Sequence, residues 1–145
     1  MKNLIFSCTL FVGALLWQSA GLSAQTTSVW GTLTMLKYEQ AGQDNNPFRK
    51  LVQQLEGQEV EVKGYIIPLT GQRAQSNFMF SKFPYNMCFF CGKAGPESVM
   101  EVYMDADQEV AFSEKPIVLK GIFRFYPGDP NQIMYKLEKA VLVER

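Results

Sequence analysis

One stretch of the chain has the hydrophobic spacing of a helix. Its apolar residues follow the pattern i, i+3, i+4, i+7: Phe48, Leu51, Val52 and Leu55. Asn46 and Pro47 are typical of the start of a helix, and Gly57 is typical of its end. The sequence therefore predicts one short amphipathic helix here.

Most other apolar segments alternate with polar residues, as strands do. Residues 59–69 and 117–126 each place apolar side chains on one face and charged ones on the other. Each also has a glycine near its middle, Gly64 or Gly121, which is typical of a bend or of a corner in a closed sheet. Further strands are predicted at Val29 to Leu36, Asn77 to Phe83, Ser98 to Met104 and Ile133 to Val143.

One short helix and five or six bent strands predict a mainly β fold. The architecture that fits best is a small OB-like Greek-key barrel, with an open meander or a sandwich as alternatives. The 145 residues suit one domain, and 47% hydrophobic against 19% charged residues is enough to form a core. We expect a single OB-like barrel domain over residues 25–145.

The first 24 residues have the three parts of a secretory signal peptide. Lys2 precedes an apolar run from Leu4 to Trp17, and small or polar residues follow as far as Ala24. The run is shorter than the ~20 residues that a spanning helix needs. We expect residues 1–24 to be removed, leaving an exported, periplasmic protein without a stable membrane span.

Composition narrows the chemistry. The chain has no histidine, which excludes a Ser-His-Asp triad, a Cys-His nucleophile pair, and zinc or haem held by histidine. Its 14 Lys+Arg balance 14 Asp+Glu, so it lacks the excess of positive charge that is typical of proteins that bind nucleic acid. We expect a non-enzymatic protein with no haem, no nucleotide and no nucleic-acid partner, and only thiol–disulfide exchange stays open as a reaction.

Cys88 and Cys91 form a Cys-x-x-Cys motif, a spacing that lets two sulfurs meet at one point. Gly92, Gly95 and Pro96 suit a tight turn directly after the motif. Three interpretations stay open: a metal site, a structural disulfide, and thiol–disulfide exchange.

Thiol–disulfide exchange ranks last on architecture. It needs a sulfur with a lowered pKa, which Lys93 or the start of a helix could provide. A thioredoxin fold, however, alternates strands and helices, and this chain predicts one helix. A disulfide suits an exported protein, where it would staple an envelope module that interacts with another protein.

For a metal site, two thiolates are half of a tetrahedral zinc shell. Without histidine, the other ligands must be carboxylates or come from a second subunit. The nearest acidic candidates are Glu97, Glu101 and Asp105. For copper, the soft partners would be Met87 or Met100. We expect Cys88, Cys91 and Glu97 to bind zinc before copper.

Aromatic residues crowd the same part of the chain, with six of them between Phe78 and Phe90. They either fill one end of the barrel or line a recess over the cysteines that shields an ion or receives a partner's side chain. The recess residues would be Phe80, Tyr85, Phe89 and Phe90. Because Phe89 and Phe90 are adjacent, an extended segment would point them in opposite directions.

Three runs carry a family resemblance: VKGYIIPL at residues 62–69, MCFFCG at 87–92 and AGPESVME at 94–101. Over roughly Trp30 to Val143, the chain resembles an uncharacterised bacterial family of small exported proteins that carries a domain-of-unknown-function label. Members typically begin with a signal peptide. Some are encoded beside ABC-type transport systems of Gram-negative bacteria, and a link to metal uptake has been suggested for relatives.

The resemblance implies a periplasmic accessory to an envelope transport system and favours the metal interpretation, but it implies no reaction and no ligand set. Lys93 departs from the pattern, which leads us to expect a small residue in this turn. A cation beside two thiolates weakens the case for a doubly charged metal and slightly favours a thiol or disulfide role.

Overall fold

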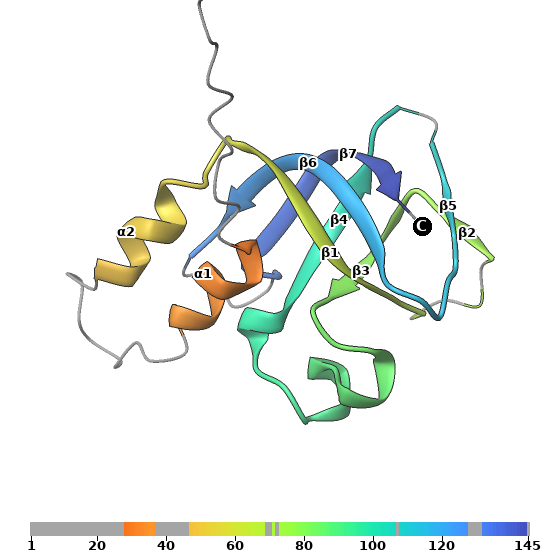
Figure 1. The fold of residues 1–145 in the computed structure, drawn as a ribbon, viewed down its shortest axis with the longest axis horizontal. Coiled ribbons are helices and arrows are strands. Elements are labelled where there is room, and N and C mark those ends of the chain that lie inside the picture. Colours follow the sequence, from red (N-terminus) through yellow and green to blue (C-terminus); the bar gives the residue numbers. More distant parts are fainter. Residues whose placement is uncertain are drawn as a thin grey trace, which may run out of the picture.

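The computed structural model describes residues 28–36, 47–68, 71, 73–106, 108–127 and 132–144 (Figure 1). The predicted signal peptide lies outside these residues, as does Asn46, the expected start of the helix. Across the described ranges the fold is mainly β, with a closed barrel of five strands and two short helices. The predicted fold class is therefore confirmed, although one helix was expected.

The barrel strands are β1 (Glu59–Ile67), β3 (Asn77–Ser81), β4 (Val99–Met104), β6 (Ile117–Phe125) and β7 (Tyr135–Glu144). Around the barrel their order is β1-β3-β4-β7-β6, and β6 pairs with β1 to close the ring. All neighbouring pairs are antiparallel except β4 and β7, which are parallel. This Greek-key connection, in which the last strand inserts between the third and fourth barrel strands, is that of an OB-like barrel.

The two glycines of the alternating segments lie where neighbouring strands come very close. A Cβ atom added to Gly64 would lie 2.5 Å from the Ser81 carbonyl oxygen and 2.9 Å from the Phe80 ring. One added to Gly121 would lie 2.8 Å from the Glu138 carbonyl oxygen. Since backbone atoms block both positions, no side chain fits there, and the ring closes tightly at each glycine.

The segment predicted as a strand at Val29 to Leu36 is instead the helix α1 (Val29–Met35), so that prediction is wrong. Val29, Trp30 and Leu33 of this helix are buried against the barrel core, as is Leu36 directly after it. Val29, Leu33 and Leu36 follow the spacing i, i+4, i+7, and this single apolar face outweighs the β preference of the threonines and Val29. The Thr34 hydroxyl donates to the Trp30 carbonyl oxygen at 2.6 Å, which keeps it within the helix. The Trp30 indole donates to the Lys63 carbonyl oxygen of β1 at 2.7 Å.

The predicted amphipathic helix is present as α2 (Pro47–Gln53). Val52 is buried, and Phe48 and Leu55 pack against the same core. Leu51 was expected on the apolar face but is 42% exposed, because it lies at the edge of that face on a helix of only seven residues. No helix in the described ranges has the length and apolar character needed to cross a membrane.

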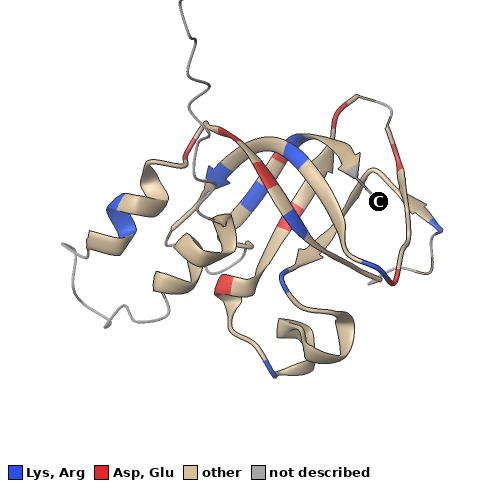
Figure 2. Cartoon of the chain, viewed as in Figure 1, with Lys and Arg blue, Asp and Glu red and all other residues tan. Residues whose placement is uncertain are grey.

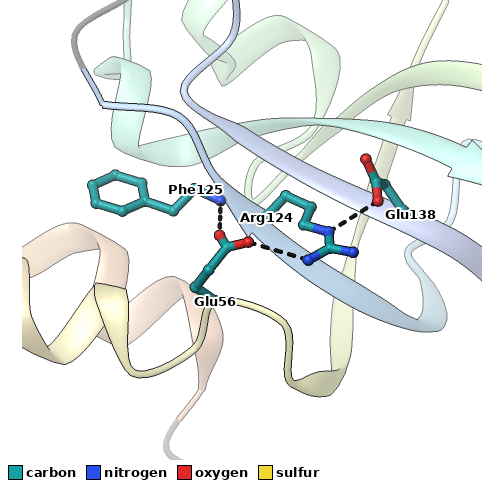
Figure 3. Close-up of polar contacts among 4 residues, drawn as sticks. All are labelled: Glu56, Arg124, Phe125 and Glu138. Carbon is teal, nitrogen blue, oxygen red and sulfur yellow. Dashed lines mark hydrogen bonds and ion pairs between the residues drawn. The ribbon is translucent and has the colours of Figure 1, made fainter.

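An ion-pair network ties the end of α2 to the barrel (Figure 3). Arg124 on β6 donates to the Glu138 carboxylate at 2.9 Å and to the Glu56 carboxylate at 3.2 Å. Glu56 also accepts the backbone N–H of Phe125 at 2.5 Å. One side chain beyond α2 is thereby fixed to two neighbouring positions of β6.

Candidate functional site

Both cysteines lie in residues 82–98, the connection from β3 to β4, which we call the cysteine loop. Its base is closed by a backbone hydrogen bond from Lys82 N to the Ser98 carbonyl oxygen at 2.9 Å. Three short 3₁₀ turns follow inside it: η2 (Tyr85–Met87), η3 (Phe89–Cys91) and η4 (Pro96–Ser98). η2 contacts β1 and η4 contacts α1, so the loop is anchored on two sides. Neither η2 nor η3 carries a charged residue (Figure 2).

The Cys-x-x-Cys motif itself forms a tight turn, whereas the predicted turn lay directly after it. The backbone N–H of Cys91 donates to the Cys88 carbonyl oxygen at 3.2 Å, and that of Gly92 donates to the Phe89 carbonyl oxygen at 2.8 Å. Gly92 ends the turn with φ of 70°, a left-handed conformation that favours glycine. The turn therefore brings both sulfurs to the same side of the loop.

The two sulfur atoms lie 4.0 Å apart and both thiols are free, but their surroundings differ. Cys88 is fully buried in a small apolar cluster on the outside of the barrel, with Ile67, Met79 and Val99. Cys91 is exposed, and its thiol donates to the Tyr85 carbonyl oxygen at 2.8 Å. The pair thus has one sheltered sulfur and one that reaches solvent.

The pKa of the Cys91 thiol is raised above its ordinary value. Loss of solvent around the sulfur is the main cause, and the neighbouring Cys88 thiol adds to it, while the Lys93 ammonium and a backbone hydrogen bond from Cys88 act in the opposite direction. A thiol with a raised pKa is mostly protonated at neutral pH and attacks disulfides slowly. This disfavours thiol–disulfide exchange, as the absence of alternating strands and helices among the described elements also does.

Acidic side chains do not gather around the cysteines. Glu97 is partly buried in η4 and lines a cavity of about 200 Å³ together with Lys82 and Lys93, and neither cysteine lines that cavity. Glu101 lies on β4, where the Lys136 ammonium is 3.3 Å from its carboxylate. Among the residues that can be described, no group of three or more Cys, Asp or Glu side chains is placed to hold a metal ion.

The two methionines considered as copper ligands have opposite environments. Met100 is completely enclosed in the barrel core, on the inner face of β4, and so is not available to a surface metal. Met87 immediately precedes Cys88 and is 50% exposed. Of the two, only Met87 shares the surface of the cysteine loop.

The four aromatic residues expected to line one recess are separated. Phe80 has no exposed surface and belongs to the barrel core, so it is not accessible to a partner. Phe89 packs against the cluster that buries Cys88. The Phe90 ring stands edge-on to the Phe89 ring, with the two ring centroids 5.5 Å apart. Tyr85 and Phe90 are 54% and 42% exposed. The loop therefore presents separate apolar side chains on its surface.

Sequence reasoning missed a cavity beside the loop. It has a volume of about 450 Å³, and Tyr85 lines it together with Tyr65, Pro68 and Phe112. These residues come from β1, the segment after it and the segment that follows β5 (Val110–Ala111), which pairs with β2 (Ala74–Gln75). No local pattern indicates that segments so far apart in sequence share a cavity.

Sequence reasoning also missed a polar cluster formed by β4, β7 and the residue directly after β6. The Lys136 ammonium lies 5.6 Å and 5.2 Å from the ring centres of Tyr103 and Tyr126. Burial alone would lower the pKa of Lys136, but the Glu101 carboxylate and the two tyrosines outweigh burial and the pKa is raised. For Tyr103 burial acts in the opposite direction, because it disfavours the charged phenolate, so burial and the Glu101 carboxylate both raise the pKa of Tyr103. The cluster keeps a charged lysine on β7 paired with a carboxylate on β4, an arrangement that favours the pairing of these parallel strands.

Comparison with family models, with curated proteins and with solved structures gives no significant match for this chain. The chemistry available to the cysteine loop is therefore inferred from its own atoms.

Proposed function

We propose that this chain is an exported, non-enzymatic protein that binds one transition-metal ion, zinc before copper, between Cys88 and Cys91. The observation that carries the proposal is the 4.0 Å separation of the two sulfur atoms. In a tetrahedral zinc site with bonds of about 2.3 Å, two sulfurs lie about 3.8 Å apart. The sulfur separation needs only a small adjustment, but Cys88 is fully buried and must also move toward the surface to bind the ion.

The local turn supports the same proposal. A metal ligand must be a thiolate, so binding displaces the thiol protons and competes with the Cys91 hydrogen bond to Tyr85. Loss of solvent and the Cys88 thiol raise the pKa of Cys91, which opposes the thiolate, and the Lys93 ammonium and the backbone hydrogen bond from Cys88 offset this only in part. Glu97 remains a proposed third ligand that would have to turn away from its cavity beside Lys82 and Lys93.

A periplasmic location and a role beside an envelope transport system belong to the proposal as well. They rest on the signal-peptide pattern of residues 1–24 and on the family resemblance of the cysteine segment. In that role the protein would hold an ion for the transport system without catalysing a reaction.

The alternative is an envelope interaction module stapled by a Cys88–Cys91 disulfide. The sulfur separation also favours this alternative, because bonding at about 2.05 Å needs a limited approach of the two side chains. The exposed side chains of Tyr85, Met87 and Phe90 would then contact the partner protein. An oxidoreductase is the weakest alternative because the described elements do not alternate strands and helices as a thioredoxin fold does.

Native mass spectrometry tests the proposal on the chain purified after export without chelator or reductant. We expect a mass raised by one zinc or copper ion, and we expect the ion to be lost when Cys88 and Cys91 are both replaced by serine. Glu97→Gln shows whether that carboxylate is a ligand. A metal-free chain that is two hydrogens light would instead establish the disulfide and overturn the metal proposal.

A further inference from the structure

We infer that, with zinc, two copies of this chain share one ion, each contributing Cys88 and Cys91. The inference rests on the proposed function, namely that the two thiols bind a metal, and adds the partner that completes the site. It would make the protein a zinc-dependent homodimer.

Zinc needs more ligands than one copy of the chain supplies, which implies a second copy. A structural zinc site is closed by four protein ligands. The part of the chain that the structure describes supplies two sulfurs and places no third Cys, Asp or Glu side chain beside them, and histidine is absent from the whole sequence. A second copy supplies the same pair of sulfurs, which completes a tetrahedron of four thiolates.

The surface around Cys91 can pack against the same surface of a second copy of the chain. Tyr85, Met87 and Phe90 are 54%, 50% and 42% exposed, and all three lie in the same loop as the cysteines. From Phe83 to Gly92 the sequence has no charged residue. Two copies related by a two-fold axis bring identical surfaces together, so a neutral apolar loop can meet its own copy without repulsion between like charges.

The charge of Lys93 distinguishes a shared site from a single-chain site. One zinc ion with two thiolates is neutral, so an adjacent ammonium leaves an uncompensated positive charge beside the metal. One zinc ion with four thiolates carries two negative charges, and the two Lys93 residues of a dimer balance them. The lysine that weighs against zinc in one chain therefore favours zinc between two chains.

The burial of Cys88 fixes the side from which the second copy approaches. Its sulfur is covered by Ile67, Met79 and Val99, whereas the sulfur of Cys91 is 4.0 Å away and reaches solvent. The shared ion must approach the pair from the Cys91 side, and Cys88 must move toward that side to bind it. The partner's loop then faces Tyr85, Met87 and Phe90.

The stoichiometry of zinc binding tests the inference. Zinc is added to the reduced, metal-free chain up to one equivalent, and native mass spectrometry counts ions and chains. We expect a dimer that holds one zinc, and EDTA should return it to monomer. A monomer that holds one zinc would overturn the dimer and leave the proposed function standing. No uptake of zinc or of Cu⁺ by the reduced chain would overturn both.

Variants identify the ligands and the contact surface. A mixture of isotope-labelled wild type with the C88S/C91S variant should form no zinc-bridged heterodimer. If Glu97→Gln abolishes zinc uptake, then Glu97, the third ligand of the single-chain site, binds the ion in place of a second copy, and the four-cysteine site is overturned. Lys93→Gln should weaken zinc-dependent dimerisation by roughly tenfold, as removal of a supporting group near a metal does.

The M87S/F90S variant tests the contact surface, and Leu51→Ser is its control. Leu51 is as exposed as Phe90, at 42%, but lies on α2. We expect M87S/F90S to weaken the dimer and Leu51→Ser to leave it unchanged, with circular dichroism confirming that both variants fold. Equal effects of the two variants would overturn the loop as the contact surface.

Discussion

The sulfur atoms of Cys88 and Cys91 lie 4.0 Å apart, yet only the Cys91 side chain is open to solvent. We expect iodoacetamide to label Cys91 before Cys88 in the reduced, metal-free chain, as mapped by mass spectrometry. Because the pKa of Cys91 is raised, its labelling rate should reach half its maximum above the pH of about 8.5 that is typical of a free thiol. Lys93→Gln should move this midpoint higher still, since the ammonium favours the thiolate. Earlier labelling of Cys88, or a midpoint below that of a free thiol, would contradict the geometry.

Gly121→Ala and Gly64→Ala should destabilise the barrel. In each variant the new methyl group would meet a backbone carbonyl of the neighbouring strand, at 2.8 Å and 2.5 Å respectively. We expect the free energy of unfolding in urea to fall by about 1–3 kcal/mol or more in each variant. Gly71→Ala is the control, because nothing lies within 4 Å of its added methyl group. An effect of Gly71→Ala as large as the others would show that the loss does not come from crowding.

Leu33→Ala tests whether α1 seals the barrel. Leu33 is fully buried in the barrel core, and its truncation should lower the free energy of unfolding by about 2–5 kcal/mol. Met35 on the same helix is 38% exposed, so Met35→Ala should cost far less. Equal losses, measured by urea unfolding, would contradict the helical placement of this segment.

Glu56→Ala should loosen the attachment of α2 to β6. It removes the contact with Arg124 and the acceptor for Phe125 N–H, both of which are partly open to water. We expect a loss of about 0.5–1 kcal/mol in low salt, decreasing as ionic strength rises. Urea unfolding at two salt concentrations measures it, and a loss that does not change with salt would mean that the ion pair contributes little.

The strands of the barrel could be predicted because each has one face inside and one outside. In β6, Ile117, Leu119, Gly121 and Phe123 are buried while Val118, Lys120 and Ile122 are partly exposed, so the alternation is visible in the sequence. Gly64 and Gly121, near the middle of two strands, also indicated that the sheet closes. The strand order required long-range pairings, such as β4 beside β7, that no local pattern contains.

The helix α1 could not be separated from a strand by composition. Val29, Thr32 and Thr34 prefer strands, but the segment has only seven residues and its burial on one face decides its conformation. The apolar face became evident only with the barrel end that it covers. Short apolar segments of this kind are ambiguous between helix and strand.

In the cysteine loop, sequence spacing predicted that the sulfurs would converge, because a Cys-x-x-Cys turn is a local structure. The unequal burial of Cys88 and Cys91 could not be predicted, since Ile67, Met79 and Val99 reach Cys88 from three different strands. The enclosure of Phe80 has the same origin. Local chemistry was visible in the sequence, whereas access to it depends on the whole barrel.

The place of β7 in the ring determines when the protein can fold during synthesis. β7 (Tyr135–Glu144) follows the other four barrel strands in the sequence, so it is synthesised after them, and it fills the gap between β4 and β6. Until it arrives, β4 and β6 each present an unpaired edge and the ring stays open. The ring therefore closes only after all five of its strands have been synthesised.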